Sequence, residues 1–228
     1  MILASPGPVV FLDTSCLLDI IRTGWHVRCH PRFIPAASGM IEMASESPPS
    51  LWVVAAEIVR NEWADNCEQI ADDTQRRICE LDQSIKVLAE VLNHLGLARL
   101  GELPNFPSYP IRSRLRGMAE NLLGVAKVLG EDYGCSILAS RRSIMGWAPA
   151  SKGKDELKDC MIIEQYISLC RMLRETGFSP KCVFISSNVK DYGRGGRPLP
   201  PLDKNFEDVG IEYVTDLAWA MSIVRASY

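Results

Sequence analysis

The sequence lacks long hydrophobic runs and closely spaced cysteines, and both absences narrow the classes of protein to consider. No apolar stretch in the 228 residues approaches the roughly 20 residues of a transmembrane helix, so we expect no membrane span. The N-terminus has neither the basic start nor the long apolar segment of a secretory signal. The eight cysteines include no Cys-x-x-Cys pair, which favours reduced thiols over a disulfide framework or a zinc ribbon. Together these absences predict a cytoplasmic protein.

Histidine is also scarce, with three residues in the whole chain. None stands in a sequence context suited to partner a serine nucleophile, which argues against a Ser-His-Asp hydrolase. His26 and His30 flank Cys29 at metal-like spacing, but no second Cys/His pair would complete a zinc site. The glycine-rich segment 193–196 lacks the Lys-Ser/Thr ending of a phosphate-binding P-loop. Serine-hydrolase, zinc and P-loop chemistry are therefore all disfavoured.

Charge is unevenly distributed along the chain. The net charge of −3 does not by itself indicate a nucleic-acid-binding protein. Residues 57–82, however, hold eight acids and three bases, a local net charge of −5, whereas residues 112–158 hold nine bases and five acids, a local net of +4. Such asymmetry arises either from an acidic metal pocket beside a basic substrate surface or from two solvated helical faces. The sequence leaves both interpretations open.

The apolar residues, 47% of the chain, are enough for a proper core. Along the chain they occur partly in short continuous runs, as in buried strands, and partly at the spacing of a helix face. Short apolar runs predict strands at about 8–13, 51–55, 181–186 and 211–214. Helical spacing predicts helices at about 14–22, 36–46, 57–97, 112–130, 132–144 and 156–175, with a last helix capped by Thr215. The Gly- and Pro-rich stretch 193–201 is predicted to be a mobile loop. Strands that alternate with helices predict an α/β fold with a parallel sheet.

The first predicted strand ends abruptly in an acid. The run Val-Val-Phe-Leu leads directly into Asp13, which places this carboxylate at the carboxyl end of the strand. Ligands bind at that edge in open α/β sheets. Thr14 and Ser15 can cap the helix that follows. An ionised carboxylate is costly to bury unless it is paired or binds a metal, so further acids at this edge would indicate a metal site.

Three further acids occupy comparable positions. Glu62 lies in the first turns of the helix after the second strand, and Asp191 follows the third strand. Asp159 lies at a helix start, where the helix dipole stabilises an anion. If the strands are parallel and adjacent, all three face the same edge as Asp13. Any one of these acids alone is more often a cap or turn residue, and Glu57 competes with Glu62 for its role.

This ordered set resembles the PIN domain, a family of metal-dependent ribonucleases. The resemblance rests on Leu-Asp-Thr-Ser around Asp13, Glu-Ile-Val-x-x-Glu ending at Glu62, a lone Asp159 at a helix start, and Ser-x-Asn-x-x-Asp from Ser186 to Asp191. It implies a PIN-like three-layer α/β fold with a central, mostly parallel sheet flanked by helices.

The resemblance covers the two ends of the chain. It extends over about 8–63 and 155–217 and leaves about 64–154 without a counterpart in compact PIN toxins. We therefore expect one PIN-like domain over 1–228 with a helical insertion at about 64–154.

The resemblance also implies a metal centre. In the family the first three carboxylates hold a divalent metal, which here would be Mg²⁺ or Mn²⁺ held by Asp13, Glu62 and Asp159. Asp191 would add a ligand or orient a water, with support from Ser15, Ser186 and Asn188. Oxygen donors suit these cations, and a bound metal can activate water and stabilise the leaving oxygen of a phosphodiester. Many members have an acid where Asn188 stands, so occupancy of a second metal site stays open.

Basic side chains supply the expected contacts to RNA phosphates. The preferred contacts are Lys152 and Lys154, which precede Asp159, with Arg194 and Arg197, which follow the last motif. Arg141, Arg142 and Lys158 are further plausible phosphate contacts. So are Arg112, Arg114 and Arg116, although a solvated helix face explains this group about equally well.

The predicted function is metal-dependent endoribonuclease activity on an RNA substrate. The main alternative is a catalytically silent PIN-like module that binds RNA or protein. A different Mg²⁺-dependent phosphohydrolase is disfavoured, because its nucleophilic Asp would have a second Asp two residues on, where this chain has Ser15. The sequence leaves open an antitoxin or another protein partner, a homodimer, and cleavage of DNA.

Overall fold

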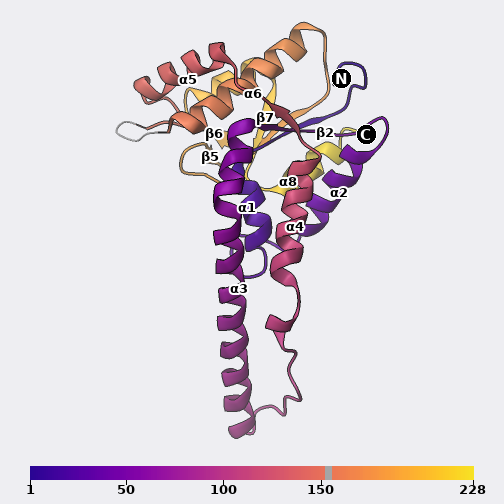
Figure 1. Ribbon diagram of the computed structural model, residues 1–228, viewed down its shortest axis with the longest axis vertical. Coiled ribbons are helices and arrows are strands. Elements are labelled where there is room, and N and C mark those ends of the chain that lie inside the picture. The colour runs from indigo at the N-terminus through magenta and orange to yellow at the C-terminus, as the bar shows by residue number, and fades with distance from the viewer. Residues whose placement is uncertain (152–155) are drawn as a thin grey trace.

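The computed structural model describes residues 1–151 and 156–228, and a parallel sheet forms its centre (Figure 1). Five strands make up this sheet: β1 (Val9–Leu12), β2 (Trp52–Ala56), β3 (Lys127–Leu129), β4 (Cys182–Ile185) and β7 (Ile211–Val214). They lie in the order β3-β2-β1-β4-β7, and every neighbouring pair is parallel. All residues of β1, β2 and β4 are buried, as expected for parallel strands covered on both faces.

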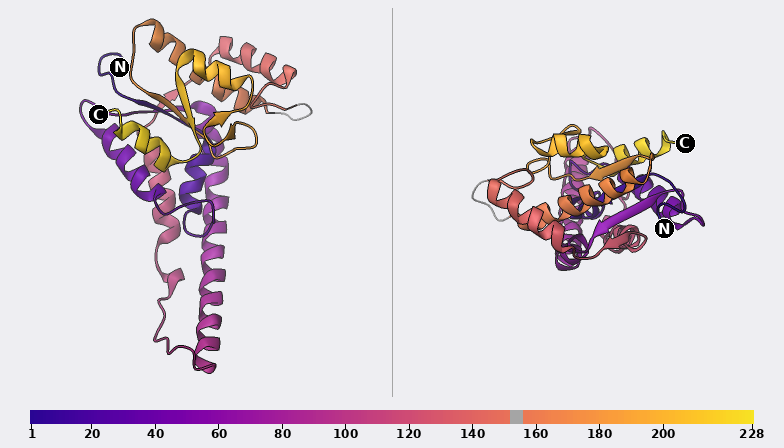
Figure 2. Two further views of the ribbon diagram at one scale, coloured as in Figure 1. Left: turned by 180° about the vertical axis from the view of Figure 1, so that it is seen from behind. Right: turned by 90° about the horizontal axis from the view of Figure 1, so that it is seen from above.

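Helices cover both faces of the sheet (Figures 1 and 2). One layer contains α1 (Thr14–Arg22), α2 (Phe33–Ser45), α4 (Ile111–Gly124) and α8 (Leu217–Arg225). The other contains α5 (Tyr133–Met145), α6 (Leu157–Glu175) and α7 (Leu202–Val209). Tyr166 of α6 joins this second layer to the sheet, because its ring stacks on Phe11 of β1 at 4.7 Å between centroids. The predicted three-layer α/β fold with a parallel sheet is confirmed.

Two local predictions are wrong. The helix predicted over 112–130 ends at Gly124, and Lys127–Leu129 instead pairs with β2 as an edge strand. The predicted insertion at about 64–154 therefore contains a strand of the central sheet as well as helices. The stretch 193–201 is not a simple loop, since β5 (Gly193–Arg194) and β6 (Arg197–Pro198) form a small hairpin. Helix α7 was not predicted at all.

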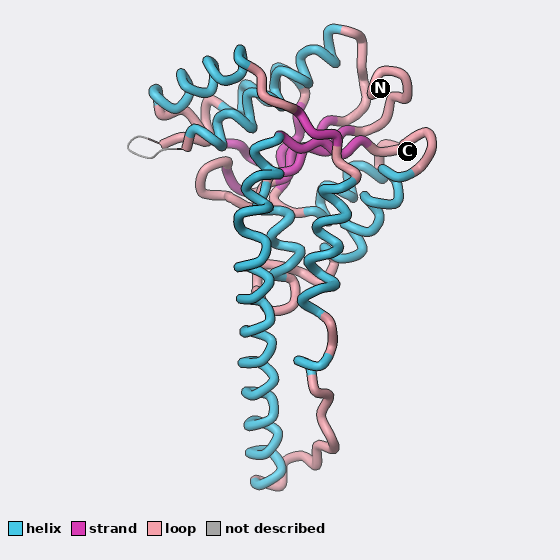
Figure 3. The backbone as a smooth tube through the Cα atoms, in the orientation of Figure 1, coloured by secondary structure: helices cyan, strands magenta, loops and turns pink. Residues whose placement is uncertain are grey.

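A long helix projects from this body. Helix α3 (Glu57–His94) has 38 residues and so measures about 57 Å at 1.5 Å per residue. Its first half packs on α1 and α4, where the indole of Trp25 donates a hydrogen bond of 2.8 Å to Thr74 Oγ1. Figure 3 shows only helix and loop in the lower half of the molecule. We call its far end, residues 79–105, the stalk.

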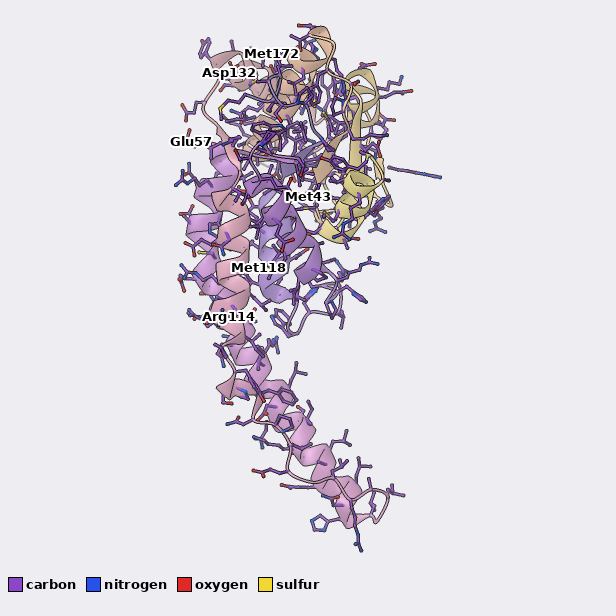
Figure 4. All side chains as sticks on the ribbon, turned by 90° about the vertical axis from the view of Figure 1, so that its right-hand side faces the viewer. Met43, Glu57, Arg114, Met118, Asp132 and Met172 are labelled. Atoms are coloured by element: carbon purple, nitrogen blue, oxygen red, sulfur yellow. The ribbon has the colours of Figure 1, made fainter. Side chains whose placement is uncertain are left out.

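The stalk is thin and sparsely covered. The chain returns along it as a loop that reaches the short 3₁₀ helix η1 (Phe106–Ser108), whose first N–H bonds Asp82 Oδ1 at 3.2 Å. Several apolar side chains of the stalk are exposed: Leu81, Ile85, Leu88, Val91 and Leu95. In Figure 4, Met118 and Arg114 lie where α4 still accompanies α3, and side chains further down project freely. No helix in the described part of the chain is long and apolar enough to cross a membrane.

Candidate active site

Asp13 is buried directly after β1, and one of its two carboxylate oxygens is fully engaged. Its Oδ2 accepts hydrogen bonds from the hydroxyls of Ser15, at 2.5 Å, and Ser186, at 2.7 Å, and from the Ser15 N–H at 3.4 Å. Asp13 is thus itself the N-cap of α1, which corrects the prediction that Thr14 or Ser15 caps this helix. Its Oδ1 accepts no hydrogen bond from the described residues and so stays available to a ligand.

The segment after β4 is tied to the segment after β1. Ser186 follows β4, and its hydroxyl bonds Asp13 as above and also accepts the N–H of Asn188 at 3.2 Å. The N–H of Ser187 donates to Ser15 Oγ at 3.1 Å. The side-chain amide of Asn188 in turn donates to Asp191 Oδ2 at 2.7 Å. The pairing of β1 with β4 therefore places these groups at one edge of the sheet.

Glu62, rather than Glu57, lies beside the first strand's end. The hydroxyl of Thr14 donates a hydrogen bond of 2.6 Å to Glu62 Oε2, which fixes this carboxylate against the N-terminus of α1. Glu57 begins α3 and is exposed, and Figure 4 shows it at the outer edge of the molecule. The structure therefore brings Glu62 close to Asp13 and leaves Glu57 apart from it.

Asp159 completes the group from the first turn of α6. Burial, together with the negative charges of Asp13, Glu62 and Asp191, raises the pKa of its carboxyl to about 7. A hydrogen bond of 3.1 Å from the hydroxyl of Tyr192 acts in the opposite direction. The pKa of Asp13 is also raised, first by burial and then by the charge of Glu62. The charges of Asp13, Glu62 and Asp191 thus all act on the carboxyl of Asp159, and the charge of Glu62 acts on that of Asp13.

The donor chemistry of this group suits a hard divalent cation. It offers carboxylate oxygens from four segments of the chain. A bound cation would relieve the repulsion between these negatively charged groups. Within residues 1–151 and 156–228, however, no three acidic, histidine or cysteine side chains already lie close enough together to hold a metal ion. Binding would therefore require side-chain adjustment, for which the unbonded Oδ1 of Asp13 and the half-exposed Glu62 leave room.

The four basic residues predicted to contact the substrate lie in different places. Lys152 and Lys154 lie outside the described residues. Arg194 and Arg197 are exposed on the β5–β6 hairpin, but they face different hollows. Arg194 lines a cleft that also includes Ser15 of the carboxylate group, whereas Arg197 lies beside α7 and α8.

Several other candidate phosphate contacts are occupied within the protein. Arg142 is buried and donates to Glu164 Oε1 at 2.7 Å. Arg112 pairs with Asp72 and Glu68 of α3 at 2.7 and 2.8 Å, and Arg116 of α4 pairs with Glu68 at 2.9 Å. The acidic and basic halves of the sequence thus neutralise each other in part across the α3–α4 contact.

Two tyrosines of the site were not predicted. Tyr192 is buried and bonds Asp159, and it directly follows the last acid of the Ser-x-Asn-x-x-Asp motif. Tyr166 donates to the carbonyl of Leu12 at 2.6 Å and accepts the N–H of Ala56 at 2.9 Å, so it joins the ends of β1 and β2. Its position seven residues after Asp159, on the same face of α6, is the signal that could have identified it.

Comparison with known proteins agrees with this geometry. A family model described as PIN domain matches residues 10–192, a range that includes all four carboxylates. Searches of curated proteins and of solved structures found no match. PIN domains are typically metal-dependent nucleases. Because the family model spans well over half of the sequence, the chain belongs to the PIN domain family.

Proposed function

We propose that this protein is an endoribonuclease that hydrolyses RNA phosphodiester bonds with Mg²⁺ or Mn²⁺. The observation that carries the proposal is a group of hydrogen-bonded carboxylates after β1 and β4 and on α3 and α6: Asp13, Glu62, Asp159 and Asp191. Four acids gathered in a partly buried site destabilise one another, and a divalent cation would reverse that penalty. A cytoplasmic location remains a prediction from the sequence, which leaves an antitoxin and a homodimer open.

Each carboxylate has a defined part in the proposal. Asp13 would present its free Oδ1 to the metal, while Ser15 and Ser186 hold the other oxygen in place. Glu62 would be oriented by Thr14 in the same way. When bound, the metal supplies an activated water and stabilises the negative charge of the leaving oxygen.

The remaining two acids are also held by hydrogen bonds. Tyr192 donates to Asp159, so that its hydrogen bond fixes the direction of this carboxylate. Asn188 holds Asp191 Oδ2 and leaves the other oxygen to bind a metal or orient a water. The uncharged Asn188 adds no further anion, which suits a site with fewer cations than one built from five acids.

The test is cleavage of a mixed RNA pool in Mn²⁺ by wild type, Asp13→Asn and wild type in EDTA. Asp13→Asn keeps the shape of the side chain but removes a charge, so the cleavage rate should fall by orders of magnitude. Asp208→Asn, an equal charge change at an exposed position of α7, is the matched control and should cleave as wild type does.

Two outcomes would contradict the proposal. Equal cleavage by wild type, Asp13→Asn and the EDTA sample would identify a contaminating nuclease. RNA binding without cleavage in any form would instead identify the silent binding module that the sequence left as the alternative.

A further inference from the structure

A cleft of about 630 Å³ opens beside the carboxylates on the side of α1. It shares Ser15 and Asn188 with the carboxylate site, and its other walls come from segment 19–33, Arg194 and segment 215–216. Because Ser15 bonds Asp13 and Asn188 bonds Asp191, the cleft and the carboxylates are contiguous. A molecule lying in the cleft would therefore extend to the candidate metal site.

The wall formed after α1 contains a repeated local structure. The sequence His-x-Arg occurs at 26–28 and again at 30–32. In each copy the histidine Nδ1 accepts the backbone N–H of the arginine two residues later, at 3.3 Å and 3.2 Å. An Nδ1 that accepts carries no hydrogen, so the neutral ring has its N–H at Nε2. Both rings line the cleft, which gives it two N–H donors in addition to its arginines.

The cleft also has positive charge that nearby acids do not neutralise. Its two acids are each paired, Asp19 with Arg22 at 3.2 Å and Asp216 with Arg32 at 3.4 Å. Arg28 and Arg194, by contrast, have no carboxylate partner in the part of the chain that the structure describes. The cleft thus combines two unpaired guanidinium groups with two imidazole donors, which is a donor set for an anion.

His26, Cys29 and His30 are unsuited to bind a metal. The Nδ1 atoms of His26 and His30 already accept backbone hydrogen bonds. Cys29 is buried, and burial together with the charge of Asp19 raises the pKa of its thiol to about 12, which keeps it protonated. The metal-like spacing of these three residues therefore serves the backbone turns.

We propose that the cleft binds the phosphodiester backbone of a single nucleic-acid strand next to the bond that is cut. Arg28 and Arg194 would contact phosphates by charge, and His26 and His30 would donate through Nε2. The proposal rests on the proposed nuclease function, since it is the shared wall at Ser15 that carries the strand to the carboxylates. It adds a binding region to the site without assigning the cleft any part in the chemistry.

The test is direct binding of a labelled single-stranded 12-nucleotide RNA in EDTA, measured by fluorescence anisotropy over a series of salt concentrations. The double variant Arg28→Gln/Arg194→Gln removes two phosphate contacts. Its affinity at low salt should fall at least tenfold, and its slope of log K against log[salt] should decrease in magnitude by about 1.4, or about 0.7 per phosphate. The matched control Arg99→Gln/Arg171→Gln changes the same charge at exposed positions outside the cleft and should keep the wild-type slope.

A further variant separates the histidine ring from the turn that it supports. In His30→Asn the side-chain carbonyl can still accept the Arg32 N–H, as in an Asx-turn, but the Nε2–H is gone. Affinity for RNA should fall about threefold while the melting temperature stays within a degree of wild type. The same strand as DNA should bind with similar affinity, because the contacts are to phosphates.

These binding measurements test the cleft proposal without a cleavage assay. Equal slopes for the two double variants, or no RNA binding by the wild type, would overturn the cleft proposal. Equal binding of poly-glutamate and RNA at the same salt would overturn it in favour of an acidic peptide. If the cleavage test fails but the slopes differ as expected, the nuclease proposal falls while the cleft stands as a nucleic-acid site.

Discussion

Asp13 differs from an ordinary helix cap in how its two oxygens are used. Three donors converge on Oδ2, whereas Oδ1 accepts nothing from residues 1–151 or 156–228. Hydrogen bonds to one oxygen stabilise the charged form, although burial still dominates and raises the pKa. Such a carboxylate is held in a fixed direction without being neutralised, which is the condition for binding a cation.

The raised pKa of Asp159 makes stability depend on pH. Its carboxyl titrates near 7 when folded and near 3.8 when unfolded, so the folded protein binds more protons between these values. Without metal, the free energy of unfolding should therefore decrease as pH rises from about 4 to about 7, by up to about 4 kcal/mol. Urea denaturation in EDTA at pH 5.0 and 7.5 measures this change. Asp159→Asn should flatten it and Asp208→Asn should not; equal slopes in all three proteins would contradict the assignment.

Tyr166 should contribute to stability through its hydroxyl. Tyr166→Phe keeps the ring but leaves the Leu12 carbonyl and the Ala56 N–H without their partner in a buried place. We expect a loss of about 1–3 kcal/mol in the free energy of unfolding. Tyr133→Phe, at an exposed tyrosine, is the matched control and should change stability by less than about 0.5 kcal/mol. A loss no greater than the control's would show that the two backbone groups find other partners.

For single residues, the sequence indicates which acids lie at the ends of strands and starts of helices, but not which side chains form hydrogen bonds to them. Each acid follows a strand or lies in the first turns of a helix, and those positions can be read from the pattern of apolar residues. Tyr166 lies in a largely apolar helix, where a tyrosine is usually part of the core, and Tyr192 stands between charged residues and glycines that indicate a loop. Their hydroxyl contacts depend on which strands are neighbours, and that information is not local.

Among the elements, α5, α6 and α7 are joined by one buried guanidinium. Arg142 of α5 donates to Glu164 of α6 at 2.7 Å, to the carbonyl of Ala148 at 2.7 Å and to Asn205 of α7 at 2.9 Å. All three contacts need the fixed fork of an arginine. Because α6 also carries Asp159, this junction positions one wall of the carboxylate site.

Removing that guanidinium should be costly. Arg142→Ala leaves Glu164 charged and buried without a partner, so we expect a loss of about 3–5 kcal/mol in the free energy of unfolding. Arg141→Ala, its exposed neighbour, loses only a contact over the Trp147 ring and should cost about 1 kcal/mol or less. Chemical denaturation of both variants gives the comparison. Similar losses for the two would mean that the buried contacts add little.

The elements that sequence reasoning missed are short or irregular. Strand β3 has three residues, too few to show a period, and it forms because β2 offers an open edge. Helix α7 shows the helical spacing of Leu202, Phe206 and Val209, but it follows a proline-rich stretch that was assigned to a loop. The hairpin before it depends on Gly193, whose φ of 131° is rare for other residues and where a Cβ would lie 2.1 Å from the Arg197 carbonyl oxygen.

For the whole molecule, metal binding should appear as thermal stabilisation. A cation that binds the folded site at 100 times its Kd adds about 2.7 kcal/mol, which corresponds to a rise of roughly 5–10 °C in Tm for a chain of this size. We expect this rise with millimolar Mn²⁺ at pH 7.5 and a smaller one at pH 5.5, where Asp159 is protonated. Asp13→Asn should have a higher Tm than wild type in EDTA and lose most of the shift. No rise in wild type up to tens of millimolar Mg²⁺ or Mn²⁺ would count against the site.

The arrangement of strands and helices could be predicted from the sequence, whereas the overall shape of the molecule could not. Alternating strands and helices predicted the parallel sheet, and the acids at strand ends predicted the edge where they meet. The long helical pattern after Glu57 was also recognised, and α3 is continuous from Glu57 to His94. That its second half would stand clear of the body as a stalk could not be predicted, because its apolar stripe looks the same whether it is covered or exposed.

The order of the strands has a consequence for how the protein is made. Thr14 and Glu62 are 48 positions apart and can meet early, but the bond between Asp13 and Ser186 joins residues 173 positions apart. The central strand β1 therefore cannot pair with β4 until Cys182–Ile185 has been synthesised. Contacts between residues so far apart in the sequence form slowly in folding. For the proposed nuclease, the growing chain would therefore have no complete carboxylate group until Asp191 has been added and β4 has paired with β1.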